Sequence, residues 1–506
     1  MSAVLQALRR HAAHQPGQCA IEGIEATLGY RALHDEAAET GRKLADAGVR
    51  RLGLALDNSP AWIVSDLAAM SAGIPMVPLP PFFTARQNAH ALRDAGIGHA
   101  LTDRPAAFTE ELADRGIAFR DKGRVPVAGK LLRLFALDLP AVPLPPGTVK
   151  ITYTSGTTGD SRGVCLDQSL LDRVAAALAA AAAFTAADRH FCVLPLATLL
   201  ENVAGLYAPI LAGACCLVPP PADAGMTGSS GFDALRLIHG VARRGATTAI
   251  LLPQLLKELT AVADAERRRL RSLRYVAVGG SRVAPALLAS ARDVGLPVYE
   301  GYGLSECGSV VALNTPAADK PGSVGRPLPH VGVAIAPDGE IRVRGAAMLG
   351  YTGGAAAPAP EWVATGDLGM LDENSFLHVT GRKKNVLITS YGRNVAPEWV
   401  ESELEAQPGI AGAAVYGDAR PWCAAVIASP LTGSDEGRAR IAALVAAANR
   451  ALPDYAQVHA WVPADAPFSA VRGELTANGR LRRDVIRQRY GARIDQLYGE
   501  ALHGVL

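Results

Sequence analysis

A glycine- and hydroxyl-rich loop at residues 152–164, TYTSGTTGDSRGV, has the composition of a phosphate-binding site. Glycines let successive backbone N–H groups converge on one anion, and hydroxyl side chains add further donors. Arg162, near the end of the loop, supplies a cation where negative charge would develop. A flexible linker is the alternative interpretation. The residues expected to bind phosphate are Thr154, Ser155, Gly156, Thr157, Thr158 and Gly159.

The segments beside this loop favour phosphate binding. A β-prone run at residues 149–151 precedes the loop, and an amphipathic alanine- and leucine-rich segment at residues 169–184 follows it. We therefore predict a strand, the loop and a helix in that order.

Three later motifs carry residues of similar character. In YGLSE, Tyr302 could stack on a base, Ser305 could bond phosphate and Glu306 could hold a magnesium ion. TGDLG contributes Asp367, and GRKKN contributes Arg382. Each motif alone has an ordinary alternative: a helix cap, an Asx turn and a solvated charged loop, respectively.

The rest of the chain alternates strand and helix patterns, which predicts an α/β fold of mostly parallel sheets covered by helices. Strict alternation at residues 339–344 predicts an antiparallel strand in a small β subdomain near residues 322–380. No element is assigned to residues 103–147. We expect helices at residues 30–47, 60–72, 85–95, 397–405 and 439–451, and strands at residues 52–56, 76–78, 99–102, 191–194, 214–218, 248–252, 274–278, 386–389, 412–416, 423–427 and 458–462.

Composition limits the class of protein. A chain of 506 residues, 49% apolar and 19% charged, can bury several cores, and its length suggests about three domain-sized units. The net charge of +2 gives no electrostatic footprint for nucleic acid. Seven scattered cysteines suggest reduced thiols, and the apolar run at residues 174–184 is too short to cross a bilayer of ~30 Å. We expect a soluble cytoplasmic protein with no integral membrane segment and no nucleic-acid partner.

The order and spacing of the motifs carry more information than each motif alone. The loop, YGLSE, TGD, GR and YGRNVAPEWVE at residues 391–401 together resemble the adenylate-forming superfamily of acyl-CoA synthetases and adenylation domains. The resemblance covers nearly the whole chain. It implies an AMP- and acyl-binding domain at residues 1–380, a hinge at 381–385 and a small, mobile α+β lid domain at 386–506.

The resemblance implies that ATP and Mg²⁺ activate a carboxylic acid as acyl-AMP with release of pyrophosphate. A thiol of CoA, or of phosphopantetheine on an acyl carrier protein, then displaces AMP. By the same resemblance, Lys384 lies at the hinge between two domain orientations. The implied roles are adenine stacking for Tyr302, α-phosphate contact for Ser305, Mg²⁺ binding for Glu306, ribose binding for Asp367, ribose or phosphate contact for Arg382, and adenine or substrate contact for Gly280 and Ser281.

Several positions depart from the family pattern. Arg162 in the loop and Arg480 in the last motif, GELTANGRLRRDVI, stand where the family has lysine, with Arg482 as an alternative for the second position. Arginine keeps the charge but delivers it as a planar fork. Thr198 stands where the family has a histidine near the acyl pocket. Arg282 either meets an anionic substrate group or lies on the surface.

The last motif resembles the fatty-acyl branch, so the leading hypothesis is a ligase for an apolar, fatty-acid-like acid. One alternative is a specialised adenylating ligase that acts on another acid or oxyanion with an amine acceptor. The other is a nucleotide-binding protein without turnover. Neither the chain length of the acid nor the oligomeric state follows from the sequence. Candidate pocket residues are Leu199, Leu200, Val203, Leu251, Leu255 and Val276.

Overall fold

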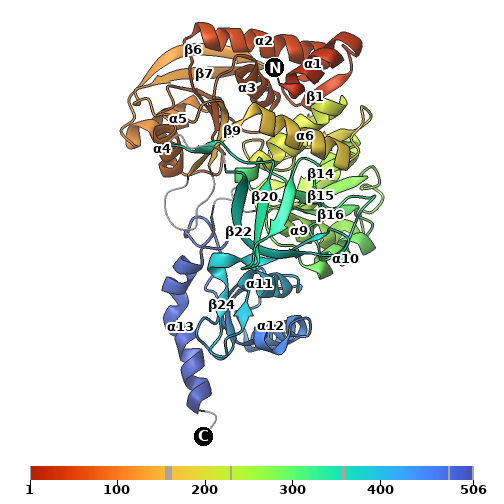
Figure 1. The fold of residues 1–506 in the computed structure, drawn as a ribbon, viewed down its shortest axis with the longest axis vertical. Helices are drawn as coiled ribbons and strands as arrows, with labels where there is room; N and C mark the ends of the chain where they lie inside the picture. The colour runs from red at the N-terminus through yellow and green to blue at the C-terminus, as the bar shows by residue number, and fades with distance from the viewer. Residues whose placement is uncertain (1, 154–161, 228–230, 355–359, 477–478, 504–506) are drawn as a thin grey trace.

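The computed structural model describes residues 2–153, 162–227, 231–354, 360–476 and 479–503. Two large sheets, a small antiparallel sheet and a separate C-terminal unit make up the fold (Figure 1). The predicted α/β class with mostly parallel sheets is confirmed. Among the described residues, the helices are too short or too polar to serve as transmembrane spans.

The first large sheet has nine strands in the order β18-β17-β16-β15-β14-β10-β11-β1-β2. Its six inner strands are parallel, and antiparallel pairs close both edges. The strands are β1 (Cys19–Gly23), β2 (Thr27–Gly29), β10 (Arg189–Phe191), β11 (Cys215–Val218), β14 (Thr248–Leu251), β15 (Tyr275–Val278), β16 (Val298–Tyr302), β17 (Ala312–Leu313) and β18 (Arg326–Pro327).

The second large sheet has eight strands in the order β21-β9-β8-β4-β3-β5-β7-β6, with a parallel centre. Two of its strands and α5 (Pro105–Asp114) fill the segment for which the sequence predicted no element. The strands are β3 (Leu52–Ala55), β4 (Met76–Pro78), β5 (His99–Thr102), β6 (Phe119–Val127), β7 (Lys130–Leu137), β8 (Thr148–Tyr153), β9 (Gly163–Asp167) and β21 (Gly350–Tyr351).

Strand β9 corrects the predicted order of strand, loop and helix. Gly163–Asp167 pairs antiparallel with β8, with Val164 opposite Thr152, before α6 (Gln168–Ala181) begins. The short apolar run in β9 is fully buried, and such a run cannot be told from the start of a buried helix by its pattern. The glycine-rich sequence therefore connects two paired strands.

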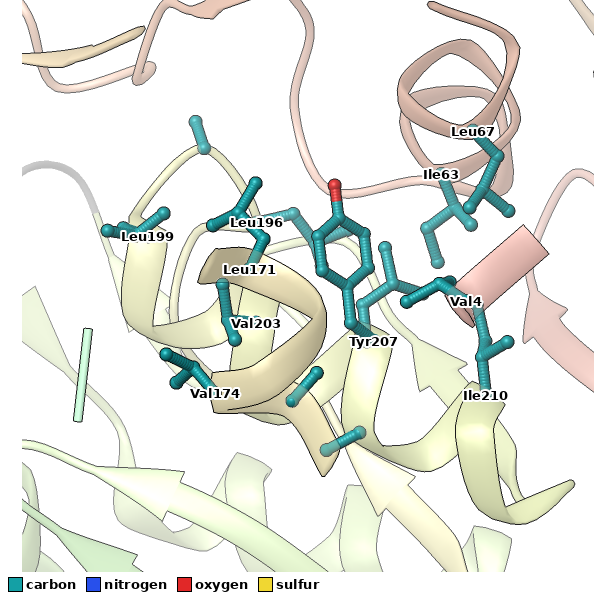
Figure 2. Close-up of a cluster of buried hydrophobic side chains, with 14 of the residues drawn as sticks. Val4, Ile63, Leu67, Leu171, Val174, Leu196, Leu199, Val203, Tyr207 and Ile210 are labelled. Carbon is teal, nitrogen blue, oxygen red and sulfur yellow. The ribbon is translucent and has the colours of Figure 1, made fainter. Parts of the chain in front are cut away.

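Helices cover both large sheets and share the main core with them. Ser59 caps α3 (Pro60–Ser71) by accepting from the backbone N–H of Trp62, and every α3 residue from Pro60 to Ala69 is buried. A π-helix, η1 (Glu201–Tyr207), packs beside α6, as Figure 2 shows for Val203 and Tyr207 next to Leu171. The remaining helices here are α1 (Ala3–His14), α2 (Tyr30–Asp46), α4 (Ala85–Asp94), α7 (Ala208–Ala212), α8 (Ala234–Arg244), α9 (Pro253–Ala263) and α10 (Pro285–Asp293).

A four-stranded antiparallel sheet follows, in the order β19-β20-β22-β23. It realises the predicted small β subdomain, with the alternating GEIRVR sequence in β20. Its register places Asp367 opposite Arg382. The strands are β19 (Gly332–Ile335), β20 (Glu340–Arg344), β22 (Trp362–Leu371) and β23 (Leu377–Arg382).

The C-terminal unit has its own apolar cores, made of residues from 387 onward. It lies below the large sheets in Figure 1, with α13 along one side. Ser434 caps α12 through the backbone N–H of Gly437, so this helix begins before the predicted residue 439. Its elements are β24 (Leu387–Ile388), β25 (Asn394–Val395), α11 (Pro397–Glu405), β26 (Gly412–Tyr416), β27 (Cys423–Ala428), α12 (Asp435–Asn449), β28 (Val458–Pro463) and α13 (Arg483–His503).

Candidate active site

A cavity of about 190 Å³ lies along one face of the nine-stranded sheet. Its mouth is formed where β15 and β16 end, at Gly280 and at Tyr302, and η2 (Ser305–Cys307) brings Ser305 to the same place. Carboxyl ends of parallel strands are the usual place for a ligand site in such sheets. The mouth of this cavity therefore gathers three predicted residues, Tyr302 and Ser305 from the YGLSE motif and Gly280 from another segment.

Arg480 reaches this mouth from the C-terminal unit. Its Nη2 donates to the Gly280 carbonyl at 3.2 Å, and its backbone N–H donates to Thr476 Oγ1 at 3.0 Å. Gly280 has a φ of +90°, a conformation that costs glycine little and strains other residues. The contact places a cation from the last sequence motif against the rim of the cavity.

A hydrogen-bonded chain fixes the next three predicted residues. Tyr302 donates its hydroxyl to Asp367 Oδ2 at 2.7 Å, and Arg382 Nε lies 2.8 Å from Asp367 Oδ1. Burial and the Asp367 carboxylate raise the pKa of Tyr302, so its hydroxyl stays a donor. Each carboxylate oxygen can still accept a further bond. The Tyr302 ring and the Asp367 carboxylate are thus held in fixed positions beside the cavity mouth.

Glu306 and Arg162 meet through a common partner. The Tyr351 hydroxyl donates to Glu306 Oε1 at 3.2 Å, and the Arg162 guanidinium lies 5.4 Å from the centre of the Tyr351 ring. Tyr351 belongs to β21, which pairs with β9 directly after Arg162. The other candidates in the loop, residues 154–159, lie outside the described residues.

Three cations influence one another near the mouth. Burial, followed by the Arg382 guanidinium, lowers the pKa of Arg480, while Asp367 and Glu306 act in the opposite direction. Burial, Arg382 and Arg480 likewise lower the pKa of Lys384. Cations that destabilise one another in this way make a favourable place for an anion.

The wall of the cavity is largely apolar and includes the turn before η1. Leu199 and Leu200 line it as expected, together with Thr198, whose hydroxyl donates to the Pro195 carbonyl at 2.7 Å. Leu178 and Phe184 contribute from the region of α6. This composition suits an apolar ligand.

Four of the expected lining residues pack elsewhere. Val276 alternates with Tyr275 and Ala277 along β15, and Leu251 follows Ile250 on β14, so both point to the opposite face of the sheet from these lining residues. Leu255 joins the same core, and Val203 faces the core around α6. These four predictions were wrong because the sequence pattern did not reveal which face carried the cavity.

The two polar residues after Gly280, Ser281 and Arg282, lie in different environments. Ser281 is exposed directly after Gly280. Arg282 is half-buried and its Nη1 donates to the Val379 carbonyl at 2.9 Å, so it is neither a surface residue nor one of the described residues lining the cavity. Burial lowers its pKa, and Glu300 acts against that shift.

A buried polar group at the opposite end of the cavity was missed in the sequence. His190 and Thr248 line it, and Glu201 contacts His190 from η1. His190 and Thr248 lie in short strands, and Glu201 lies in a segment that reads as apolar. The register that makes them neighbours is a tertiary feature with no local signal.

The comparisons with known proteins agree with this geometry. The family model of the AMP-binding enzyme matches residues 8–352, and that of the AMP-binding enzyme C-terminal domain matches residues 384–502. The chain belongs to the AMP-binding enzyme family. The predicted membership of the adenylate-forming superfamily is confirmed, and with it the class of AMP-forming acid–thiol ligases.

Three similar proteins span most of the chain. A long-chain-fatty-acid–CoA ligase, FadD15, of Mycobacterium bovis is 29% identical and aligns over 87% of this chain and 86% of its own. Indoleacetate–CoA ligase of Aromatoleum aromaticum is 30% identical over 84% of this chain and 87% of its own. O-succinylbenzoate coenzyme A synthetase of Bacillus subtilis, solved with ATP and magnesium, is 22% identical with a TM-score of 0.74, over 94% and 98% of the two chains.

Proposed function

We propose that this ligase activates an apolar, fatty-acid-like carboxylic acid as acyl-AMP and transfers the acyl group to the thiol of CoA. The proposal rests on one observation: the candidate nucleotide-binding residues lie at the opening of the apolar cavity. The Arg480 guanidinium, bonded to Gly280, and the chain of Tyr302, Asp367 and Arg382 meet at the opening of an apolar cavity. Nucleotide and acid would therefore bind with their reacting groups next to each other.

Each group at the mouth has a chemical task in this proposal. Tyr302, locked by its hydroxyl bond, presents a ring face for adenine. Asp367 accepts bonds from the ribose hydroxyls, for which a fixed carboxylate suits a diol. Arg480 lies where the acid carboxylate and the α-phosphate would meet, and it stabilises the charge that develops between them.

The residues near Glu306 fit a magnesium ion. A carboxylate oriented by Tyr351 at the cavity mouth is a hard oxygen ligand of the kind that Mg²⁺ prefers. The ion would neutralise phosphate charge. Arg162, held over the Tyr351 ring, supplies a further cation toward the phosphates. Tyr351 would then position both the magnesium-binding residue, Glu306, and the phosphate-binding residue, Arg162.

The acid and the acceptor are the finer parts of the proposal. The relatives are named for a long-chain fatty acid and for indoleacetate, so membership of the family alone does not select the acid. The lining by Leu178, Phe184, Leu199 and Leu200 favours an apolar body. CoA is proposed as the acceptor because the named relatives are CoA ligases.

ATP–pyrophosphate exchange with a panel of carboxylic acids tests the proposal, followed by release of AMP on addition of CoA. Exchange with apolar acids and CoA-dependent AMP release are expected. AMP release only with an acyl carrier protein, or only with an amine, would contradict the acceptor. ATP binding by calorimetry without exchange for any acid would contradict the activity itself.

Arg480→Ala should lower exchange by about 100-fold, since loss of one donor to a developing oxyanion commonly costs this much. Arg482→Ala is the matched control, two positions along the same motif, and should retain most of the exchange. Arg480→Lys, which keeps the charge, should fall between them. If Arg482→Ala proved the more damaging variant, the assignment of Arg480 would be wrong.

A further inference from the structure

The far end of the cavity carries a polar group. His190, Thr248 and Tyr275 are neighbours across β10, β14 and β15 in the parallel register, and all three line the cavity. Gly279, at the mouth, directly follows the end of β15 and lies four positions after Tyr275. At about 3.3 Å per residue, the cavity runs about 13 Å from its mouth to these side chains. A bound acid would point its end away from the carboxylate toward Thr248.

A short relay of hydrogen bonds lies behind that end. His190 Nε2 is 2.9 Å from Glu201 Oε1, and His190 Nδ1 is 3.0 Å from Thr248 Oγ1. Glu201 Oε2 also accepts from the backbone N–H of Leu194 at 3.3 Å. The side chains of His190 and Glu201 are buried, with exposed fractions of 1% and 0%. The groups are thus shielded from water except where His190 and Thr248 meet the cavity.

Gly205 allows this pair to form. A Cβ at Gly205, in the π-helix η1, would lie only 2.6 Å from His190 Nε2 and would also collide with the Glu201 carboxylate. Single π-helical turns are frequent at functional sites because they redirect side chains. Here η1 carries Glu201. Among the described residues, its carboxylate is the only one bonded to His190, which lines the cavity.

The same side chains could suggest a metal site. The ligand atoms of His190, Cys192 and Glu201 lie within 4.8 Å of one another. However, both ring nitrogens of His190 already have hydrogen-bond partners, Glu201 and Thr248. Burial raises the pKa of Cys192 well above its usual range, so its thiol stays protonated. A hydrogen-bond relay accounts for the contacts without an ion.

The Thr248 hydroxyl is the polar group that this relay presents to the cavity. Its Oγ1 lies 3.0 Å from His190 Nδ1. A hydroxyl has one donor hydrogen and two acceptor lone pairs, so the bond to His190 leaves Thr248 able to make a second hydrogen bond. Because Thr248 lines the cavity, a ligand there can make that second bond.

We propose that the preferred acid carries an oxygen atom, in an oxo or a hydroxyl group, at the end remote from its carboxylate, where it makes a hydrogen bond with Thr248. The inference rests on the proposed function, because the acid must bind with its carboxylate at Arg480. An acid without this oxygen leaves the second hydrogen bond of Thr248 unmade in an apolar surrounding. Such a loss reduces kcat/KM by about 10- to 100-fold.

The test uses ATP–pyrophosphate exchange by the full-length enzyme with three matched series of straight-chain acids: unsubstituted acids, acids with an oxo group next to the chain end, and acids with a hydroxyl there. The oxo or the hydroxy series should exceed the unsubstituted series in kcat/KM by about tenfold or more, at a chain length that spans the cavity. Thr248→Val should bring the ratio of oxygen-bearing to unsubstituted acids close to one, and Thr248→Ser should preserve it.

Each other outcome is decisive. Rapid exchange of unsubstituted acids with no preference for either oxygen-bearing series would overturn this inference and leave the proposed function standing. Exchange with no acid at all would overturn the proposed function together with the inference. If Thr248→Val does not fold, the acid series with the wild-type enzyme still decides.

Discussion

Lys257 on α9 bonds the end of α11 across the boundary between the large sheets and the C-terminal unit. Its Nζ donates to the carbonyls of Glu405, Gln407 at 3.4 Å and Ile410 at 2.6 Å. The last carbonyls of a helix have no partner inside it, and a cation at this end also meets the negative end of the helix dipole. Together with Arg480 on Gly280, this contact stabilises the present arrangement of the two parts.

Lys257→Met keeps the apolar stem and removes the charged donor. Hydrogen bonds from a charged group contribute about 1.5–3 kcal/mol each at most, and Lys257 is only half-buried, so we expect a total loss of about 2 kcal/mol. That value corresponds to about a 30-fold shift away from the arrangement that places Arg480 at the cavity mouth. Adenylation requires this arrangement in our proposal, whereas thioester formation does not.

Two assays separate the effects. ATP–pyrophosphate exchange should fall by up to about 30-fold in Lys257→Met, while thioester formation from synthetic acyl-AMP and CoA should be unchanged or faster. Lys43→Met is the matched control, because Lys43 pairs with Glu39 on the exposed surface of α2, where such a pair contributes less than about 0.5 kcal/mol. Equal losses in both assays, or the same loss in the control, would refute the role of this contact.

Three further predictions concern single residues. Tyr302→Phe removes the bond to Asp367, so the Kd for ATP measured by calorimetry should rise about five- to tenfold, and an unchanged Kd would contradict the proposed nucleotide site. Lys384→Pro restricts the backbone at the proposed hinge and should slow thioester formation more than pyrophosphate exchange; parallel losses would argue against a hinge there. Burial raises the pKa of Glu300 to about 8, so the folded protein holds a proton that the unfolded chain has released above about pH 4.5. Stability should therefore fall as pH rises from about 4.5 to about 8, and this fall should be smaller in Glu300→Gln, as thermal denaturation at several pH values would show.

The sequence predicted most elements of the fold because their patterns are strong and local. The helix of α2 and the strand of β4 begin at the predicted residues, and Ser434 could have corrected the start of α12. Strand β9 was missed because its apolar run follows a glycine-rich loop without a period of its own. Its place is decided by pairing with β8, which is a tertiary contact.

Site residues that belong to a short sequence motif could be predicted. Those that meet only through the pairing of distant strands could not. Tyr302 and Asp367 were found from short sequences, and the structure brings them within hydrogen-bond distance. His190, Glu201 and Thr248 come from segments with no motif, and they meet only because β10 and β14 are paired and η1 turns inward. A local sequence pattern cannot predict such tertiary contacts.

A buried polar quartet joins the entrance of the glycine-rich sequence to the wall of the cavity. Lys150, on β8, donates to Asp66 Oδ1 at 2.6 Å, to Asn202 Oδ1 and to the Tyr207 hydroxyl at 2.7 Å. The Tyr207 hydroxyl, which projects from its apolar cluster in Figure 2, donates to Asp66 Oδ2 at 2.7 Å.

The quartet limits which residues can be changed to alter the acid specificity of this enzyme. Asn202 and Tyr207 lie on η1, and Lys150 lies three residues before β8 ends at Tyr153. Removing Asn202 or Tyr207 would take a hydrogen-bond partner from the buried Lys150–Asp66 pair, and an unmade bond to a buried polar group costs about 1–3 kcal/mol, more for a charged one. Libraries that vary η1 should therefore lose folded protein along with acid selectivity. Variation at Phe184, which lines the cavity from outside this network, should widen the range of acids without that penalty.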